Sequence, residues 1–586
     1  MNYSLKDKTQ KNQKKQSTFV LLRQFSVYLT GEKSRLLGAT LSIIFNSLAN
    51  IATPLILGFT IDNFIAQKNL AGITQYALYL IGLYLVIFIT GFLQTRTMGT
   101  VGQNVLYKLR NSVFAKIQSL PLEFFNQNKL GDLISRINND TDKLNQFFSQ
   151  SLVQFIGNIF SILGIGIFIF FINFQLALIA ISSAIFLLLI TYFISPWIKK
   201  KNRLSLESLG NLSAEIQESI NNFKVIVSFD RQDYFKDNFN KSNNENYSAS
   251  VKSGIANNIT APIYDLSGNV ASLLVLGFGL NLVLSGHLTI GILVAFLSYT
   301  DRFYSPLRQM AAIWSNAQSS LAGWSRILEI LNLKSNLVLL PSVEVKPTKH
   351  VLQFENVSFG YTKKKILHNV TFTFDIGKTY AIVGPTGGGK STTAALMSRL
   401  YDPQKGEVLF EGQDIRSIEP KVLSQKIGFI MQEQYLFSGT VGENIAYGLD
   451  GYEEYSKEKL LVELNSFGLS ALIEKFEDGL DTPVTPTTEL ISLGQKQIIS
   501  FLRAIIRKPD LLIMDEATAN IDTITEEILQ SIIDKLPAKT TKVIIAHRFN
   551  TIKKADEIYF VNNGQVVSAE SYEKSLQLIQ DSKRNT

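Results

Sequence analysis

The stretch "KTYAIVGPTGGGKSTTAALMSRLY", Lys378 to Tyr401, decides the fold of the second half of this chain. It opens with an apolar run typical of a buried strand, continues through a glycine loop and ends in an amphipathic helix. The pattern G-x-x-x-x-G-K-[ST] is met by Gly384, Gly389, Lys390 and Ser391. Because the flanking strand and helix are the context that this pattern requires, a chance match is disfavoured.

The glycine loop has the chemistry of phosphate binding. Glycines let backbone N–H groups curl around phosphate oxygens, and the helix start adds a partial positive charge. Lys390 supplies a charge for the β- and γ-phosphates, and Ser391 supplies a hydroxyl for Mg²⁺. The predicted phosphate-binding residues are Gly384, Pro385, Thr386, Gly387, Gly388, Gly389, Lys390, Ser391 and Thr392.

Two further apolar runs end in polar residues suited to phosphoryl transfer. Within "DLLIMDEATANID" (510–522) the apolar run ends at Asp515 and Glu516, and within "TKVIIAHR" (541–548) it ends at His547. We predict that Asp515 holds Mg²⁺ through its water shell and that Glu516 polarises the attacking water. A lone histidine is usually structural, but this chain has 4 histidines, and one at the end of a buried strand is favoured as a γ-phosphate contact.

The first half of the chain is apolar enough to cross a membrane several times. The mean hydropathy of the whole chain is +0.13, and only 18% of its residues are charged. A membrane-spanning helix needs about 20 mostly apolar residues. Six segments qualify: 36–61, 72–95, 151–172, 174–195, 263–284 and 288–308.

The placement of basic residues predicts the orientation of these spans. The long connections 104–150 and 196–258 are rich in lysine and arginine, whereas "AQKNL", "NF" and "LSGH" carry almost no charge. By the positive-inside rule, both termini and both long connections lie in the cytoplasm of a multi-pass protein of the inner (plasma) membrane. The net charge of +8 is therefore read as a membrane flank, not as a nucleic-acid surface. The absence of cysteine excludes disulfides and thiol chemistry.

These motifs, in this order, resemble those of an exporter-type half-transporter of the ATP-binding cassette (ABC) family. The resemblance implies an α-helical six-span transmembrane domain followed by an α/β P-loop ATPase domain, with ATP and Mg²⁺ as ligands. It divides the chain into a basic tail (1–20), a membrane domain (21–335), a linker (336–350) and a nucleotide-binding domain (351–586). It implies that Tyr361 stacks on adenine, that Gln432 senses Mg²⁺ and the attacking water, and that 519–522 cross between two cassettes. Leu122 to Asn126 and Asn221 to Gln232 resemble the coupling helices that contact the cassettes.

The signature loop of the family departs from its usual form in this chain. The family pattern is Leu-Ser-Gly-Gly-Gln, and the residues here are Ile491, Ser492, Leu493, Gly494 and Gln495. Ser492, Gly494 and Gln495 are predicted to face the partner's nucleotide. Leu493 places a branched side chain where the backbone should approach a phosphate, and leucine disfavours the positive φ open to glycine. The preceding "TPTT" (485–488) departs as well.

This leucine leaves two dimers open. In a heterodimer, a partner with an intact signature completes this chain's own site, and only one site is degenerate. In a homodimer, both sites contain the leucine and work slowly. We favour the heterodimer.

The substrate is less well specified. Asn46, Asn50, Asn158, Asp265 and Asp301 are polar residues in the spans, where such groups are costly. Asp265 and Asp301 could attract a cationic amphiphile. We favour the alternative, which is pairing within the membrane, such as Asp301 with a nearby arginine, or simple placement at the membrane interface. The family implies multidrug-type export of hydrophobic or amphiphilic compounds. A homodimeric lipid flippase, a peptide exporter and a regulatory subunit are the alternatives.

Overall fold

The structure is a computed structural model. It describes residues 3–5, 25–337, 339–341, 348–362, 364–447, 449, 456–485, 491–515, 523–545, 554–569, 574 and 577. The chain forms two compact units. One comprises Leu5–Gln118 and Leu130–Asn332, and the other comprises Met1–Ser4, Ser119–Lys129 and Leu333–Thr586. We call them the helical unit and the cassette unit.

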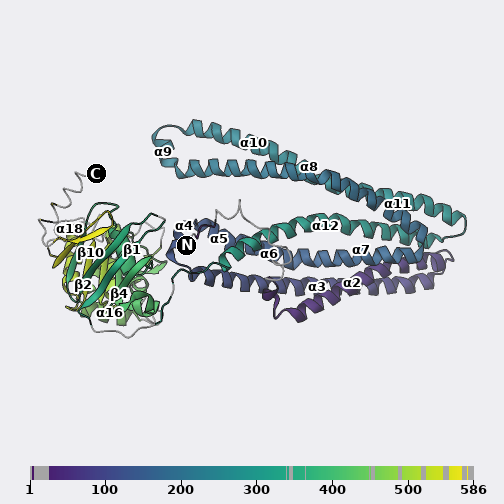
Figure 1. The fold of residues 1–586 in the computed structure, drawn as a ribbon. Coiled ribbons are helices and arrows are strands. Elements are labelled where there is room, and N and C mark those ends of the chain that lie inside the picture. The colour runs from purple at the N-terminus through teal and green to yellow at the C-terminus, as the bar shows by residue number, and fades with distance from the viewer. Residues whose placement is uncertain are drawn as a thin grey trace. The chain divides into compact units, whose positions relative to one another are not determined.

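The helical unit consists of long helices joined by short turns (Figure 1). A 3₁₀ turn, η1 (Ser26–Leu29), precedes the first long helix. The helices are α2 (Lys33–Thr60), α3 (Leu70–Gln118), α5 (Leu130–Ser135), α6 (Thr141–Gln146), α7 (Leu152–Ile172), α8 (Phe174–Asn221), α9 (Phe223–Ser228), α10 (Gln232–Asn258), α11 (Thr260–Leu284) and α12 (Ile290–Leu331). Three π-helical segments interrupt them: η2 (Ile61–Ile65), η3 (Arg136–Asp140) and η4 (Phe147–Ser151). The helices on either side of the predicted cytoplasmic connections extend well beyond the predicted spans, as expected.

Five stretches of helix in the described residues are long and apolar enough to cross a membrane, by length and composition. They run over Lys33–Ile65, Leu70–Gln118, Leu130–Ile172, Phe174–Asn221 and Gln232–Leu284. The sixth predicted span falls on α12, which does not reach the same apolarity because Asp301 and Arg302 lie in its first half. α12 nevertheless packs against α2, α7 and α11 as part of the same bundle.

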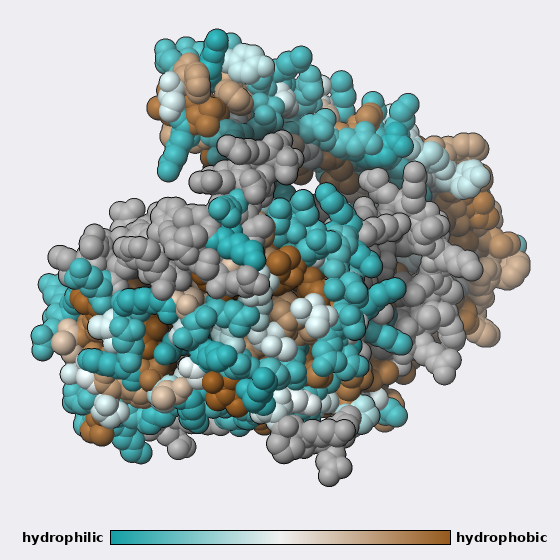
Figure 2. Space-filling model, turned by 60° about the vertical axis from the view of Figure 1, so that its left-hand side comes forward, coloured by the Kyte–Doolittle hydropathy of each residue, from teal (hydrophilic) through white to brown (hydrophobic). Residues whose placement is uncertain are grey.

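Large apolar side chains lie on the outer surface of these helices. They include Leu78, Ile81 and Phe88 of α3 and Phe186, Leu188 and Phe193 of α8, each more than half exposed. Figure 2 shows hydrophobic residues gathered over one part of the helical unit. This surface suits a lipid environment.

The cassette unit contains two main sheets. The first has the order β2-β1-β4-β5 and is antiparallel, and the second has the order β12-β11-β3-β10-β9-β6 and is parallel except for β12. The strands of the first are β1 (His350–Phe359), β2 (Leu367–Asp375), β4 (Lys405–Phe410) and β5 (Gln413–Asp414). Those of the second are β3 (Thr379–Val383), β6 (Ile427–Ile430), β9 (Leu511–Asp515), β10 (Thr541–Ile545), β11 (Glu557–Asn562) and β12 (Gln565–Ser568). A small third sheet pairs β7 (Gly439–Thr440) with β8 (Pro483–Val484).

Helices surround these sheets. They are α4 (Leu122–Gln127), α13 (Lys390–Met397), α14 (Pro420–Lys426), α15 (Val441–Ala446), α16 (Lys457–Ser466), α17 (Leu493–Ile505) and α18 (Thr523–Asp534), with 3₁₀ turns η5 (Ile415–Ser417), η7 (Ser470–Lys475) and η8 (Gly479–Asp481).

The parallel sheet is buried on both faces. In β9, Leu512 and Met514 pack into one apolar cluster, and Leu511 and Ile513 pack into another on the opposite face. All five residues of β9 are buried, as expected for a strand covered on both sides. The strands β3, β10, β9 and β6 run in the same direction, so their carboxyl ends, where ligands of such sheets bind, lie at one edge.

Candidate nucleotide-binding site

The glycine loop connects β3 to α13 as the sequence predicts. Gly384, Gly387 and Gly389 have φ values of +150°, +81° and +116°, and Gly389 is the N-cap of α13. Lys390 is 7% exposed, and its Nζ donates to the backbone oxygens of Gly384 (2.9 Å) and Pro385 (3.1 Å). The ammonium group is therefore held at the centre of the loop.

Close backbone packing makes the glycines necessary. A Cβ on Gly384 would lie 2.0 Å from the backbone oxygen of Val561 in β11, and one on Gly388 would lie 2.6 Å from the same atom. A Cβ on Gly387 would meet no atom within 4 Å. Gly387 thus lines the open side of the loop, where Thr386 and Ser391 are also exposed. This open cradle beside a buried ammonium fits the phosphates of a nucleotide, and the exposed Ser391 hydroxyl fits Mg²⁺.

The predicted magnesium residues follow neighbouring strands at one edge of the sheet. Asp515 is the last residue of β9, is 7% exposed and pairs in register with Ile545 of β10, which in turn pairs with Ile382 of β3. Gln432 follows β6 and is exposed. Asp515, Gln432 and the glycine loop therefore follow strands that end at a common edge. Glu516, His547 and residues 519–522 lie outside the described residues.

The predicted adenine-stacking residue, Tyr361, follows β1. Its ring packs edge-on against Phe359 (centroids 5.2 Å apart) and against Tyr401 (5.1 Å). Its side chain is 39% exposed, so the ring packs against Phe359 and Tyr401 and part of it remains accessible to a ligand. Tyr401 was not singled out by the sequence, and the residues "SRLY" after the loop helix gave no sign of a supporting role.

The signature loop begins α17, and this corrects one expectation. Ser492 is the N-cap, and a capping box joins it to Gln495: Gln495 N donates to Ser492 Oγ (3.2 Å) and Ser492 N donates to Gln495 Oε1 (2.9 Å). Leu493 is the first helical residue and is not among the described residues with positive φ. The expected backbone strain was wrong, because a helical first turn suits leucine. The remaining departure from the family pattern is the Leu493 side chain itself, which is 48% exposed at the start of α17.

Arg503 connects this same helix to the segment that follows Gln432. Its guanidinium donates to the backbone oxygens of Asn444 (2.8 Å) and Tyr435 (2.9 Å) and lies 5.7 Å from the ring centre of Phe437. Burial lowers the pKa of Arg503 below its usual value. The signature helix and the segment after Gln432 are thus joined by one half-buried cation.

The first predicted coupling segment folds as α4 and belongs to the cassette unit. Asn126 Nδ2 donates to the Tyr401 hydroxyl at 2.8 Å, and Phe124 is fully buried. This confirms the expected contact of 122–126 with the cassette. Because Tyr401 also supports Tyr361, α4 lies one side chain away from the predicted adenine site.

Residues near the chain start also reach α4, which the sequence did not indicate. Tyr3 is 1% exposed. Its backbone N donates to Gln127 Oε1 (2.7 Å), its backbone oxygen accepts from Asn128 Nδ2 (3.0 Å), and its hydroxyl donates to the backbone oxygen of Lys334 (2.9 Å). Burial raises the pKa of the Tyr3 hydroxyl. Tyr3 therefore fastens α4 to the segment that follows α12.

The second predicted coupling segment forms α9 in the helical unit. Ile226 is buried, but Phe223, Val225, Val227 and Phe229 are 46–73% exposed. Figure 2 shows hydrophobic residues at this projecting tip. The tip thus presents an apolar face at the turn between α8 and α10.

The polar residues of the spans mainly connect helices. Asn46 donates to Thr90 Oγ1 of α3 (2.9 Å), Asn50 accepts from Arg302 of α12 (2.8 Å), and Asn158 of α7 donates to Gln309 of α12 (3.4 Å). Asp265 pairs with Arg308 at 2.5 Å, which agrees with the favoured pairing within the membrane. Asp301 is exposed.

Comparison with known proteins finds a family match for each half of the chain. The family description "ABC transporter transmembrane region" matches residues 36–307, and "ABC transporter" matches residues 367–519. The chain is 30% identical to an uncharacterized ABC transporter ATP-binding protein, YfiC, of Bacillus subtilis (strain 168), over 97% of this chain and 94% of that protein. It is 28% identical to an ATP-dependent lipid A-core flippase of Haemophilus influenzae (strain 86-028NP), over 91% of each chain. It is 31% identical to a fatty acid ABC transporter ATP-binding/permease protein of Mycobacterium bovis (strain ATCC BAA-935 / AF2122/97), over 83% of this chain and 77% of that protein.

Both family regions thus occur in one chain, and similar proteins align with it over most of their length. The apolar helices of the first region account for membrane passage, and the family match of the second region identifies it as an ATP-hydrolysing domain. The chain therefore belongs to the ABC transporter family, as an exporter-type half-transporter with one membrane domain and one ATPase domain.

Proposed function

We propose that this protein exports hydrophobic or amphiphilic compounds, including cationic ones, as one half of a heterodimer with a second ABC half-transporter. It lies in the inner (plasma) membrane with both termini in the cytoplasm. In chain order, a basic tail (1–20), a membrane domain (21–335), a linker (336–350) and an ATPase domain (351–586) make up the protein. The observation that carries the heterodimer is the exposed side chain of Leu493 at the start of α17.

The argument rests on a difference between the two surfaces that this chain offers to nucleotides. Its glycine loop has every residue type required for phosphates, and Gly384 and Gly388 are packed so tightly that no side chain fits. Its signature helix presents the branched side chain of Leu493 beside Ser492. In such a dimer, each ATP site combines the glycine loop of one chain with the signature helix of the other. This chain therefore contributes a complete glycine loop to one site and an obstructed signature helix to the other. A partner with a glycine at the matching position restores one full site.

The roles at the full site follow from residue chemistry. Lys390 binds the β- and γ-phosphates, and Ser391, Asp515 and Gln432 hold Mg²⁺, which when bound neutralises charge on the phosphate oxygens. Glu516 orients and polarises the attacking water, and His547 contacts the γ-phosphate. Tyr361 stacks on the adenine. The partner's serine and glycine amides face the γ-phosphate from the other side, as Ser492, Gly494 and Gln495 do for the partner's nucleotide.

The exposed face of α9 is a further argument for a second chain. Phe223, Val225 and Phe229 leave apolar surface at a tip that the positive-inside rule places in the cytoplasm. Apolar residues gathered at a projecting tip are typical of a contact surface. We assign this tip to the cassette of the partner.

Two copies of the chain with different affinity tags, produced together in the native host, test this proposal. In a heterodimer, purification through one tag recovers a second half-transporter but not the other tag. Recovery of both tags in one complex contradicts the heterodimer. In the complex, Leu493→Gly should raise the affinity of the degenerate site for ATP while turnover still requires Glu516 of the full site. Leu493→Ala serves as the control, because it shortens the side chain without restoring glycine.

A homodimeric lipid flippase is the second candidate, favoured by the similarity to the lipid A-core flippases over more than nine-tenths of the chain. The protein in liposomes that contain fluorescent phospholipid separates the two activities. ATP-dependent protection of the lipid from an impermeant quencher supports a flippase. ATP-dependent accumulation of a small amphiphile without lipid movement supports the exporter.

A further inference from the structure

The chain passes between its two units at four places, after residues 4, 118, 129 and 332. Tyr3, α4 and the segment that follows α12 lie beside these crossings, and all three belong to the cassette unit. They are joined to one another although 124 residues separate Tyr3 from Gln127 and 213 separate Glu123 from Asn336. We call this cluster the joint; it consists of Tyr3, Glu123, Phe124, Gln127, Asn128, Lys334 and Asn336.

Hydrogen bonds in the joint form a closed ring. Tyr3 N donates to Gln127 Oε1 (2.7 Å), and Gln127 Nε2 donates to Glu123 Oε1 (2.9 Å). The other carboxylate oxygen of Glu123 accepts from Asn336 Nδ2 (3.1 Å). The Tyr3 hydroxyl donates to the backbone oxygen of Lys334 (2.9 Å) and so completes the ring. Tyr3, α4 and the segment after α12 are therefore each bonded to the other two.

Tyr3 uses the two ends of its side chain for different partners. Its ring meets the ring of Phe124 edge-on, with centroids 6.5 Å apart and an interplanar angle of 83°. Both side chains are buried, Tyr3 at 1% and Phe124 at 0% exposure. The ring of Tyr3 thus packs on α4, whereas its hydroxyl binds the segment after α12.

α4 and the segment after α12 are also attached to the rest of the cassette unit, at separate points. Asn126 Nδ2 donates to the Tyr401 hydroxyl (2.8 Å), and Leu340 N donates to the backbone oxygen of Arg416 (2.9 Å). Neither hydrogen bond involves Tyr3. The joint therefore adds a connection between two segments that the cassette unit already holds individually.

We propose that Tyr3 is a positioning residue of the ATP-driven cycle, which ties α4 to the segment after α12 so that both pass movement of the ATPase domain to the helical unit together. If the two segments were separate, one could shift while the other stayed in place. The ring makes such a shift costly, because each broken bond leaves a buried polar group unpaired. This role concerns movement driven by ATP and depends neither on the heterodimer nor on the substrate proposed above.

Hydrogen exchange of the purified transporter in lipid nanodiscs tests the joint itself. In Tyr3→Ala, peptides from 119–129 and 333–337 should exchange about two- to tenfold faster than in the wild type, the range that one hydrogen bond contributes. Peptides from β3 and α13 (379–397) should exchange at the wild-type rate. Faster exchange in all of these peptides would mean that Tyr3 stabilises the whole unit, and it would overturn the proposal.

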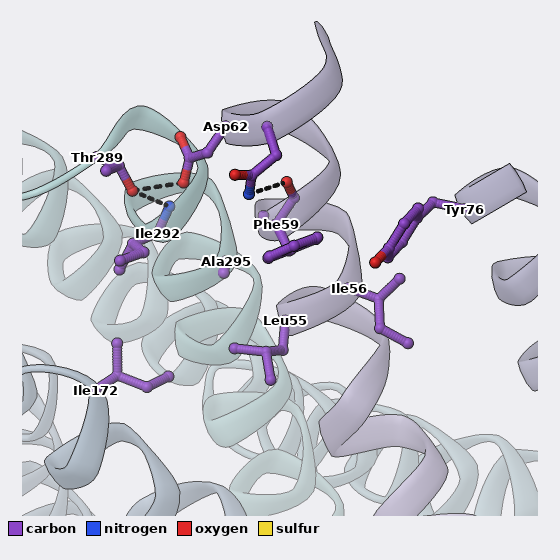
Figure 3. A pocket seen from close by; sticks show the side chains of 11 residues that line it. Leu55, Ile56, Phe59, Asp62, Tyr76, Ile172, Thr289, Ile292 and Ala295 are labelled. Carbon is purple, nitrogen blue, oxygen red and sulfur yellow. Dashed lines mark hydrogen bonds between the residues drawn. The ribbon is translucent and has the colours of Figure 1, made fainter. Parts of the chain in front are cut away.

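A pocket in the helical unit provides a reporter of the transmitted movement. It has a volume of about 570 Å³, and residues such as Leu55, Ile56, Asp62 and Ile292 line it (Figure 3). Because its walls come from α2, α3, α7 and α12, a shift of any of these helices changes the surroundings of a label there. Tyr76→Cys on α3 supplies a site for a bimane fluorophore, since the chain has no cysteine of its own. The complex without this cysteine, treated alike, is the blank.

The functional test compares the fluorescence change on addition of AMP-PNP and Mg²⁺ with the KM for ATP. Tyr3→Ala should reduce the fluorescence change about two- to tenfold. Its KM for ATP should stay within about twofold of the wild type, because the glycine loop and Tyr361 are untouched. Tyr28→Phe, which removes a tyrosine hydroxyl from the helical unit, is the matched control and should keep both values.

A second variant separates the hydrogen bonds from the packing of the ring. Tyr3→Phe combined with Asn336→Ala keeps the ring on Phe124 but removes the two side-chain bonds that reach the segment after α12. It should reduce the fluorescence change as much as Tyr3→Ala does. A full response in this double variant would show that the connection to that segment transmits nothing.

The remaining outcomes also decide the question. Faster exchange in 119–129 and 333–337 with an unchanged fluorescence response would make Tyr3 a purely structural residue and would overturn the proposal. A fluorescence response that falls together with a raised KM for ATP would place the effect at the ATP site, which also overturns it. A smaller response at an unchanged KM, with faster exchange confined to the joint, supports it.

Discussion

Asn126 of α4, the predicted coupling helix, donates a hydrogen bond to Tyr401, and the ring of Tyr401 packs against Tyr361. One tyrosine thus contacts both the segment that enters the cassette unit from the membrane domain and the residue predicted to stack on adenine. Its hydroxyl serves the first contact and its ring serves the second. Burial raises the pKa of this hydroxyl, so it stays protonated at physiological pH.

The two contacts of Tyr401 can be separated by substitution. Tyr401→Ala removes the ring behind Tyr361 and should raise the KM for ATP about two- to tenfold, because an edge-on aromatic pair contributes about 0.5–1.5 kcal/mol. Tyr401→Phe keeps the ring and should leave the KM within about twofold. Steady-state ATPase measurements on both variants check this. A Phe variant as impaired as the Ala variant would show that the hydroxyl, and not the ring, supports the nucleotide.

Neighbouring glycines of the phosphate loop should differ in their tolerance of alanine. Gly388→Ala places a Cβ 2.6 Å from the backbone oxygen of Val561 and should abolish ATP binding, since a main-chain atom must move. Gly387→Ala meets no atom, and the cost of its φ of +81° is about 1–2 kcal/mol. Binding of a fluorescent ATP analogue distinguishes them. Equal loss of ATP binding in both variants would mean that backbone conformation, and not packing against β11, determines whether alanine is tolerated.

The Tyr3 hydroxyl should stabilise the protein in a pH-dependent manner. Tyr3→Phe removes the bond to Lys334 and should lower the free energy of unfolding by about 1 kcal/mol near pH 8. Because burial raises the pKa of Tyr3, this contribution is complete below the unfolded tyrosine pKa of about 10 and is lost as pH rises above it. Thermal unfolding of both proteins at pH 8 and at pH 10.5 measures the difference, which should shrink at the higher pH. A difference that stays constant would contradict the burial of this hydroxyl.

Two neighbouring aspartates should contribute unequally to stability. Asp140 is 2% exposed and binds Arg326 (Nε to Oδ2, 2.7 Å) and Lys143 (3.2 Å). Asp140→Asn removes the buried carboxylate that joins these two partly exposed cations and should cost about 1–3 kcal/mol. Asp142 pairs with Arg110 at 2.9 Å, with both side chains well exposed, and Asp142→Asn should cost at most about 1 kcal/mol. Thermal unfolding in one detergent compares them, and similar losses would contradict the assignment of Asp140 as the buried ion pair.

The sequence predicts the structural elements that are encoded by short-range patterns. The loop from Gly384 to Ser391, the strand ending in Asp515 and most of the long helices follow from spacing and apolar runs, since each signal lies within about 20 residues. The span at 288–308 was predicted from its apolar residues, but α12 is less apolar than the other helices because it contains Asp301 and Arg302. The coupling contact of 122–126 came from resemblance to the family.

Other features depend on contacts that no local pattern announces. Tyr3 lies in a lysine-rich start that reads as a solvated tail, yet its partners are Gln127, Asn128 and Lys334. Asp62 reads as a polar residue at a helix end, and only the approach of α12 places it in a pocket. Leu493 was singled out from the sequence, and its role stays a prediction; the strain expected there was wrong, because a helix begins at that residue.

The cassette unit combines segments that lie far apart in the chain, and this affects the synthesis of the protein. Phe124 is fully buried among residues of a unit whose sheets are synthesised much later. The ribosome must add about 270 further residues before Tyr401 appears, a delay of roughly 15–55 s at about 5–20 residues per second. With the orientation proposed above, α4 exposes its phenylalanine to the cytosol during that time, and chaperones bind such surfaces there. A chain that terminates early would keep this surface exposed, and quality-control proteases could recognise the incomplete transporter by it.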